Sequence, residues 1–185
     1  MSEKSQTTGD GISRRTVTKA MAWAVPAIAV AAPIPAFAAS GPPPTVTVGP
    51  ALKWPGASCT NEPGAPLDAN KAYMFTFHVD NTTSSVIYIY GVTLTTSSGI
   101  TFSVYGADPA FGTPIAPGDS VCLHVWANSS DSGNINFDAH AEISWGHNWP
   151  GPDPDNHAPV TKDWHVSSTP TPTSAGYGQC GYPPC

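Results

Sequence analysis

Positive charge is scarce in this 185-residue chain and is concentrated near the N-terminus. Beyond residue 38 the sequence has three lysines, Lys53, Lys71 and Lys162, and no arginine, against eleven carboxylates. The formal charge of that part is therefore −8, compared with −6 for the whole chain. Nucleic-acid binding needs clustered lysine and arginine, so the composition disfavours a nucleic-acid partner.

Familiar catalytic motifs are also missing. The sequence has no Gly-x-Ser-x-Gly, no His-Glu-x-x-His, no phosphate-binding glycine loop and no Cys-x-x-Cys pair. Three of its six histidines, His78, His124 and His140, fall at outward positions of predicted strands, where we expect solvated side chains and not a shared zinc ion. We therefore expect a protein that is not an enzyme and that needs no metal or other cofactor. A small metal-dependent hydrolase is kept as an alternative.

The N-terminal segment has the features of an export signal. A basic region containing Arg14, Arg15 and Lys19 precedes an apolar run over residues 20–32 and the small-x-small sequence Ala36-Phe37-Ala38. We expect cleavage after Ala38. Prolines interrupt the apolar run, and a membrane span needs about 20 predominantly apolar residues. We therefore expect no membrane anchor after cleavage.

The basic region resembles bacterial twin-arginine signals. Ser13, both arginines and Lys19 match that pattern, whereas Val17 and Thr18 replace its usual Phe and Leu. The resemblance implies export by the twin-arginine pathway, with ordinary Sec export as the alternative. The protein would then be secreted or associated with the cell envelope.

Four segments follow from composition. Residues 1–38 form the signal peptide, residues 39–50 an extended spacer with a possible first strand over 45–48, and residues 51–166 the folded domain. Residues 51–69 are predicted to form a long loop within that domain, because they are rich in Gly, Pro and Asn. Residues 167–185 contain a Pro/Thr run that we expect to be extended and unpacked, followed by a tip closed by cysteines.

Alternation of apolar and polar residues predicts an all-β domain. Tyr73, Phe75, Phe77 and Val79 alternate with polar neighbours, which is the period of a half-buried strand. Further strand candidates are 86–95, with a bulge at Gly91, and 100–105, 120–127, 135–145 and 160–166. Six or seven short strands without helical periodicity favour an antiparallel sandwich over a barrel. Inward positions are expected at 121, 123 and 125 and at alternate residues from 135 to 145, which puts Cys122 on an outer face.

Four cysteines follow the signal, and an even number in an exported chain favours disulfides. Among the three possible pairings we favour Cys59–Cys122 and Cys180–Cys185. The Cys180–Cys185 bond would close the tight turn between these two residues. The Cys59–Cys122 bond would hold the loop that carries Cys59 against the outer face of a sheet.

Tryptophans are the best candidates for a binding surface, because an exposed indole offers a flat apolar area with a polar edge. Trp145 and Trp164 share inward positions with apolar residues and are expected in the core. Trp126 falls on an outward face, and Trp54 and Trp149 lie in loops. We therefore take Trp54, Trp126 and Trp149 as candidate binding residues.

Residues 75–83, followed by Val92-Thr93-Leu94 and by Ile115-Ala116-Pro117-Gly118-Asp119-Ser120-Val121, resemble bacterial immunoglobulin-like extracellular domains. The resemblance implies an antiparallel immunoglobulin-like β-sandwich of about seven strands. It also implies a non-catalytic function at or outside the cell envelope, in adhesion or partner binding. The same order of strand and turn sequences also resembles bacterial cellulose-binding sandwich modules. A carbohydrate-binding module is therefore the alternative. The expected partner is an envelope glycan or another surface protein.

Overall fold

The computed structural model describes residues 42–54, 72–97, 99–129, 134–150, 157–178 and 180–185. All the described residues belong to one compact unit, Phe37–Cys185. Within the described part the chain forms eight strands: β1 (Thr45–Lys53), β2 (Ala72–Asp80), β3 (Ile87–Thr96), β4 (Phe102–Asp108), β5 (Pro114–Ile115), β6 (Ser120–Ser129), β7 (Phe137–Gly146) and β8 (Val160–Val166). Among these residues we find no helix of the length and hydropathy that a membrane span requires.

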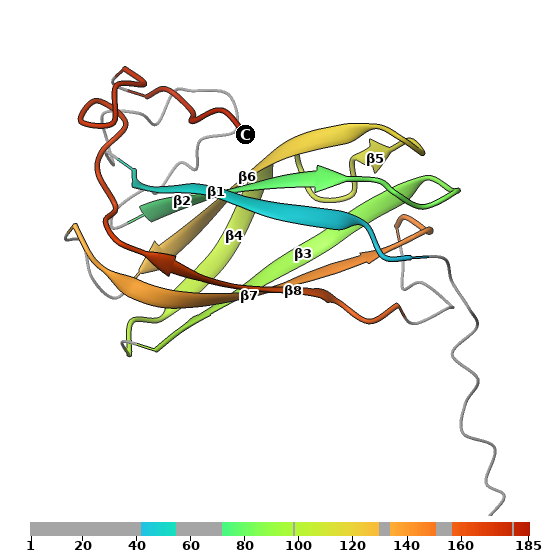
Figure 1. The fold of residues 1–185 in the computed structure, drawn as a ribbon, viewed down its shortest axis with the longest axis horizontal. Coiled ribbons are helices and arrows are strands. Elements are labelled where there is room, and N and C mark those ends of the chain that lie inside the picture. The colour runs from blue at the N-terminus through green and yellow to red at the C-terminus, as the bar shows by residue number, and fades with distance from the viewer. Residues whose placement is uncertain (1–41, 55–71, 98, 130–133, 151–156, 179) are drawn as a thin grey trace, which may run out of the picture. The chain divides into compact units, whose positions relative to one another are not determined.

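The strands form two sheets, with the orders β1-β2-β6-β4 and β5-β3-β7-β8 (Figure 1). All the neighbouring strands pair in antiparallel fashion. The predicted all-β antiparallel sandwich is thus confirmed. The six strands predicted between residues 73 and 166 are all present, with ends that differ by a few residues, and β5 is an additional two-residue strand.

The first strand is longer than predicted. It continues to Lys53, whereas residues 51–53 were assigned to a connection. The register of β1 against β2 shifts between Val48 and Ala51, around Gly49-Pro50. Proline is tolerated at a bulge of an edge strand because no ladder hydrogen bond is lost there. The Gly-Pro pair therefore bends this strand and does not end it.

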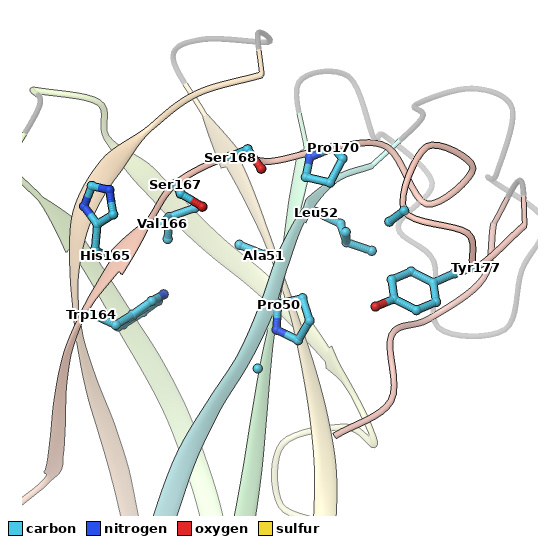
Figure 2. A pocket seen from close by; sticks show the side chains of 12 residues that line it. Pro50, Ala51, Leu52, Trp164, His165, Val166, Ser167, Ser168, Pro170 and Tyr177 are labelled. Carbon is cyan, nitrogen blue, oxygen red and sulfur yellow. The ribbon is translucent and has the colours of Figure 1, made fainter.

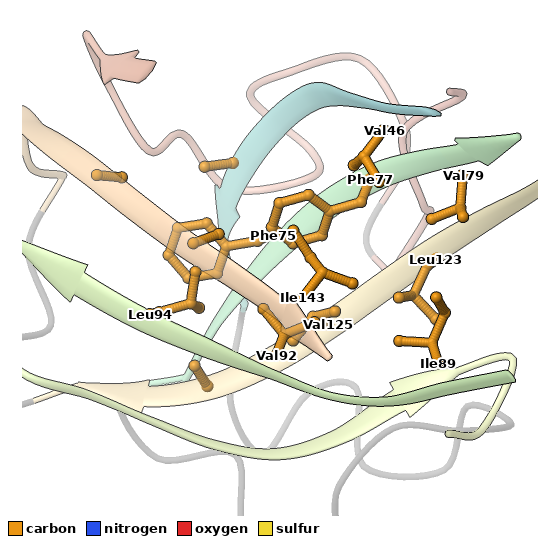
Figure 3. Close-up of a cluster of buried hydrophobic side chains, with 14 of the residues drawn as sticks. Val46, Phe75, Phe77, Val79, Ile89, Val92, Leu94, Leu123, Val125 and Ile143 are labelled. Atoms are coloured by element: carbon orange, nitrogen blue, oxygen red, sulfur yellow. The ribbon is translucent and has the colours of Figure 1, made fainter. Parts of the chain in front are cut away.

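The core between the sheets follows the predicted alternation. Tyr73, Phe75, Phe77 and Val79 of β2 are at most 1% exposed. They pack with the inward residues of β6, β3 and β7 in one hydrophobic cluster (Figure 3). The β3–β7 register shifts between Ile89 and Gly91, which confirms the predicted bulge. Trp145 is buried in this cluster, and Trp164 packs against Phe77 with ring centroids 5.9 Å apart.

The C-terminal segment, residues 167–185, is packed and not extended as predicted. Thr169 is fully buried, and its Oγ1 accepts a hydrogen bond from the backbone N–H of Ile135. The backbone N–H of Lys53 donates to the carbonyl of Pro170 at 2.9 Å. We call residues 167–185 the strap. Its Pro/Thr composition suggested a linker, but these backbone and hydroxyl groups find partners on the sandwich.

The predicted disulfide pairing is wrong. Cys122 of β6 is bonded to Cys185, with their Cα atoms 5.6 Å apart. Neither Cys59–Cys122 nor Cys180–Cys185 can then exist, because each uses one of these two residues. Cys180 is itself disulfide-bonded, and Cys59 lies outside the described residues. The short separation of Cys180 and Cys185 along the chain suggested the wrong pair, because the strap crosses the sheet and places Cys185 next to Cys122. Cys122 does face outward, and its bond holds the strap over the sheet.

Candidate functional site

The two outer faces of the sandwich have different surroundings. We call the outer face of the β1-β2-β6-β4 sheet the covered face, because the strap lies over it. Its residues Leu52, Trp54, Ala72, Met74 and Trp126 form a second hydrophobic cluster, separate from the core between the sheets. Residues of the strap pack on this cluster: Ala175, Tyr177, Cys180 and Tyr182.

The expectation that Trp54 and Trp126 are exposed is therefore wrong. Trp54 is 2% exposed and Trp126 is fully buried. Trp126 does point to the outside of its sheet, as the alternation predicted, but an outward position is exposed only if nothing else packs on it. The covering residues come from the segment that had been assigned to an unpacked linker.

Tyr182 of the strap sits among three rings of the covered face. Its ring centroid lies 5.8 Å from that of Trp54, 5.8 Å from that of Trp126 and 4.8 Å from that of His124. Trp54 and Trp126 meet edge to face at 81°. We call Trp54, His124 and Trp126 the cage, and residues 181–185 the plug.

A hydrogen bond and a covalent bond hold the plug. His124 donates from Nε2 to the carbonyl oxygen of Pro183 at 3.0 Å, and the Cys122–Cys185 bond fixes the chain end. His124 is 8% exposed, so the expectation of a solvated side chain is wrong for this histidine. No sequence motif pointed to Tyr182; its only distinction in the sequence is that it is an aromatic residue between the two cysteines of the tail, Cys180 and Cys185.

Polar atoms without partners lie in the covered face. Trp54 Nε1, Trp126 Nε1 and Thr76 Oγ1 are buried and make no hydrogen bond. A buried polar group left unsatisfied costs about 1–3 kcal/mol. Nδ1 of His78, on the same strand as Thr76, is buried without a partner as well. The strap therefore covers the apolar area of this face but leaves four hydrogen-bonding groups of its sheet unsatisfied.

A groove of about 300 Å³ lies beside the strap, between β1 and β8, which are edge strands of the two sheets (Figure 2). Figure 2 shows Trp164 and Tyr177 on opposite sides of Pro50, with Ser167 and Ser168 at the rim. This volume is at the lower end of the range for ligand pockets, about 300–1,000 Å³. The groove offers aromatic walls and hydroxyl groups.

The outer face of the β5-β3-β7-β8 sheet, which we call the open face, carries exposed polar residues. Asp138 and His165 are opposite each other on β7 and β8, with Asp138 Oδ1 2.7 Å from His165 Nδ1. His140 pairs in the same way with Asp163, at 2.7 Å between Nδ1 and Oδ1. Threonines of β3 continue this face, and a hollow of about 270 Å³ lies between them and the His140–Asp163 pair.

Carboxylates on two sides favour the charged form of His140. The hydrogen bond that the imidazole donates to Asp163 raises its pKa above the ordinary value of 6.5, and the charges of Asp163 and Glu142 raise this pKa further. Exposure to solvent limits the strength of these interactions. Protonation of His140 makes this acidic face less negative as the pH falls.

The histidines do not converge on one ion. His78 and His124 lie on the sheet that contains β2 and β6, whereas His140 lies on the other sheet. Among the described residues, no group of three or more His, Cys, Asp or Glu side chains is arranged to hold a metal ion.

Trp149 remains as a candidate binding residue at the surface. It is 46% exposed, and its ring stacks on Tyr90 with a 20° angle between the planes and 6.0 Å between centroids. The hydroxyl of Tyr90 donates to the carbonyl of Asn148 at 2.8 Å. A Cβ added at Gly112 would lie 2.0 Å from the indole, so the ring packs directly on the glycine backbone. Two contacts thus hold an indole that is half exposed, and the Tyr90–Asn148 hydrogen bond fixes the backbone next to it.

The sequence predicts Trp149 as a binding residue but gives no signal for Tyr90 and Gly112, which hold it. The positive φ of Gly112, 83°, is a conformation that glycine adopts easily. Their role depends on a contact between the β3 strand and two loops far apart in the chain.

This chain is similar to several solved structures. The cupredoxin domain of amoB from Nitrosocaldus yellowstonii has 11% sequence identity and a TM-score of 0.37, over 62% of this chain and 61% of that chain. The FixG-related protein from Vibrio parahaemolyticus has 12% identity and a TM-score of 0.36, over 68% of this chain and 94% of that chain. A comparison with protein-family models finds no match, and a comparison with curated proteins finds none. Neither structural likeness identifies a family for this chain.

Proposed function

We propose that this protein is an exported, non-catalytic, immunoglobulin-like domain that binds a partner at or outside the cell envelope. The contact surface is the open face, and the partner is an envelope glycan or another surface protein. The observation that carries the proposal is the difference between the two outer faces. One is sealed by the chain's own strap, and the other presents hydroxyl, imidazole and carboxylate groups to solvent.

Two features support export. The twin-arginine-like sequence around Arg14 and Arg15, with the small-x-small site at Ala36 to Ala38, is the first. The second is the Cys122–Cys185 disulfide, since disulfides persist in oxidising compartments outside the cytosol.

The strand order supports an immunoglobulin-like fold. Constant-type immunoglobulin sandwiches have four strands in the order A-B-E-D on one sheet and C-F-G on the other. If β5 is set aside and β1, β2, β3, β4, β6, β7 and β8 are read as A to G in chain order, the two sheets of this protein have that order.

A matched pair of substitutions tests the contact surface. Thr93 on β3 and Thr47 on β1 are both exposed, but only Thr93 lies on the open-face sheet. The mature protein, T93K and T47K are each incubated with isolated envelopes and with a panel of envelope glycans and insoluble polysaccharides. T93K should bind about tenfold more weakly, which corresponds to ~1.4 kcal/mol, and T47K should bind like the unmodified protein. Equal binding by all three proteins, or equal loss in both variants, contradicts the proposal.

A carbohydrate-binding module is the second candidate, and Trp149 favours it. Sugar rings stack on exposed aromatic side chains that offer a flat apolar area, and the Tyr90 and Gly112 contacts hold this indole in place. W149A should abolish retention on any polysaccharide that the mature protein binds. Y105A is the control, because Tyr105 is 40% exposed but lies on β4 of the other sheet. Retention that survives in W149A excludes this candidate.

A further inference from the structure

The plug occupies the cage as a peptide ligand occupies a binding site. The ring of Tyr182 enters between the cage rings, and the following Pro183 accepts a hydrogen bond from His124. Proline-rich segments commonly bind in grooves lined with aromatic residues, because their extended conformation costs little entropy to order. The sequence Tyr182-Pro183-Pro184 has this character.

The cage has more hydrogen-bonding capacity than the plug uses. Trp54 Nε1 and Trp126 Nε1 are donors, Thr76 Oγ1 is both donor and acceptor, and none of them has a partner. A peptide that is free of the covalent tether has backbone carbonyls that can move to these donors. The covered face is therefore complementary to a peptide with an aromatic side chain and free carbonyl groups.

The tether of the plug is accessible. Cys185 is exposed, and Cys122 is partly exposed. Exposed disulfides are more easily reduced than buried structural ones. Opening this one bond removes the covalent tether of the five-residue plug, which a competing ligand can then displace from its ring contacts and its hydrogen bond with His124. The rest of the strap stays attached through the Lys53–Pro170 hydrogen bond and the buried Thr169.

We propose that the cage is a binding site for a tyrosine- and proline-containing peptide of another protein, closed in the resting state by the chain's own plug. A dithiol reductant opens it. One thiolate attacks a sulfur of the Cys122–Cys185 bond and forms a mixed disulfide, and the released cysteine takes up a proton. The second thiol then displaces the other cysteine, so the reductant becomes a cyclic disulfide and both cysteines become thiols. This site lies on the covered face and does not depend on the ligand of the open face.

The test uses the full mature chain and a synthetic peptide, acetyl-Gly-Tyr-Pro-Pro-Ser-amide, with an Ala-for-Tyr peptide as control. Indole N–H resonances of Trp54 and Trp126 report binding. The unmodified protein should show no shift. C122S/C185S keeps its plug as an intramolecular competitor, whose effective concentration is of the order of mM for a short tether. Adding Tyr182→Ala to these two substitutions empties the cage and should lower the peptide Kd at least tenfold.

Reduction of the unmodified protein under native conditions gives an independent measurement. The same indole resonances should respond to the Tyr peptide after reduction and not before. The proposal is overturned if the triple variant and the reduced protein show no indole shift, or if the Ala peptide binds equally well. It is also overturned if both lose the dispersed amide spectrum of a folded protein, because the plug would then be part of the fold and not a removable ligand.

Discussion

The covered and open faces come from the same sandwich and the same strand alternation, but their outward residues have opposite character. On β6, the outward residues His124 and Trp126 are buried below the strap. On β7, the outward residues Asp138 and Glu142 are exposed. Alternation therefore determines which way a side chain points, whereas the path of the last 19 residues determines which outward side chains meet solvent.

Removal of an indole should have very different effects on the two faces. W126A leaves a cavity in a closed cluster and should lower the free energy of unfolding by about 3–5 kcal/mol, the usual range for a buried aromatic residue. W149A removes a ring that is 46% exposed and should cost about 1 kcal/mol or less. Urea denaturation of both variants gives the two values. Similar losses would mean that the faces are equally buried.

Loss of the plug's tether should destabilise the covered face only. C122S/C185S should lower the free energy of unfolding by about 2–4 kcal/mol, because the disulfide closes a loop with a sequence separation of 63 residues. Hydrogen exchange should accelerate for amides of the strap and β6, with little change in β8. Uniform acceleration in both sheets would contradict a local role for the strap.

In the loops beside β3, G112A should displace the indole of Trp149. The new methyl group would overlap the ring, and the φ of 83° disfavours any residue with a Cβ. We expect a loss of about 1–3 kcal/mol and a red shift of the Trp149 fluorescence. G118A is the matched control, since Gly118 has a φ of 80° but no neighbour within 4 Å of an added Cβ. The spectral shift should be absent in G118A.

The smallest effect is a pH dependence. The pKa of His140 is raised in the folded state, so protonation stabilises the fold. That contribution is complete below the unfolded pKa of about 6.5 and is lost as the pH rises through the higher folded pKa. An NMR titration should place the His140 pKa above that of the unfolded chain, and Asp163→Asn should lower it. A pKa that does not change in this variant would rule out Asp163 as the main cause.

The sequence predicted the strands and the inward residues of β2, β6 and β7 because a period of two is a local pattern. It also located the bulge at Gly91 and the outward position of Cys122. It failed where a residue's surroundings depend on a segment distant in the chain. The burial of Trp54 and Trp126, the partner of Cys122 and the contact of Gly112 with Trp149 all depend on such segments. Pro/Thr composition gave the wrong expectation for the strap because composition does not show whether backbone groups find partners.

The most direct test of the difference between the faces is chemical access to the tryptophans in the native, oxidised protein. A short pulse of a tryptophan-selective oxidant, followed by peptide mapping, measures the modified fraction at each position. If the strap covers Trp54 and Trp126, we expect rapid modification of Trp149 and little modification of Trp54 and Trp126. Modification of Trp54 or Trp126 as fast as that of Trp149 would contradict it.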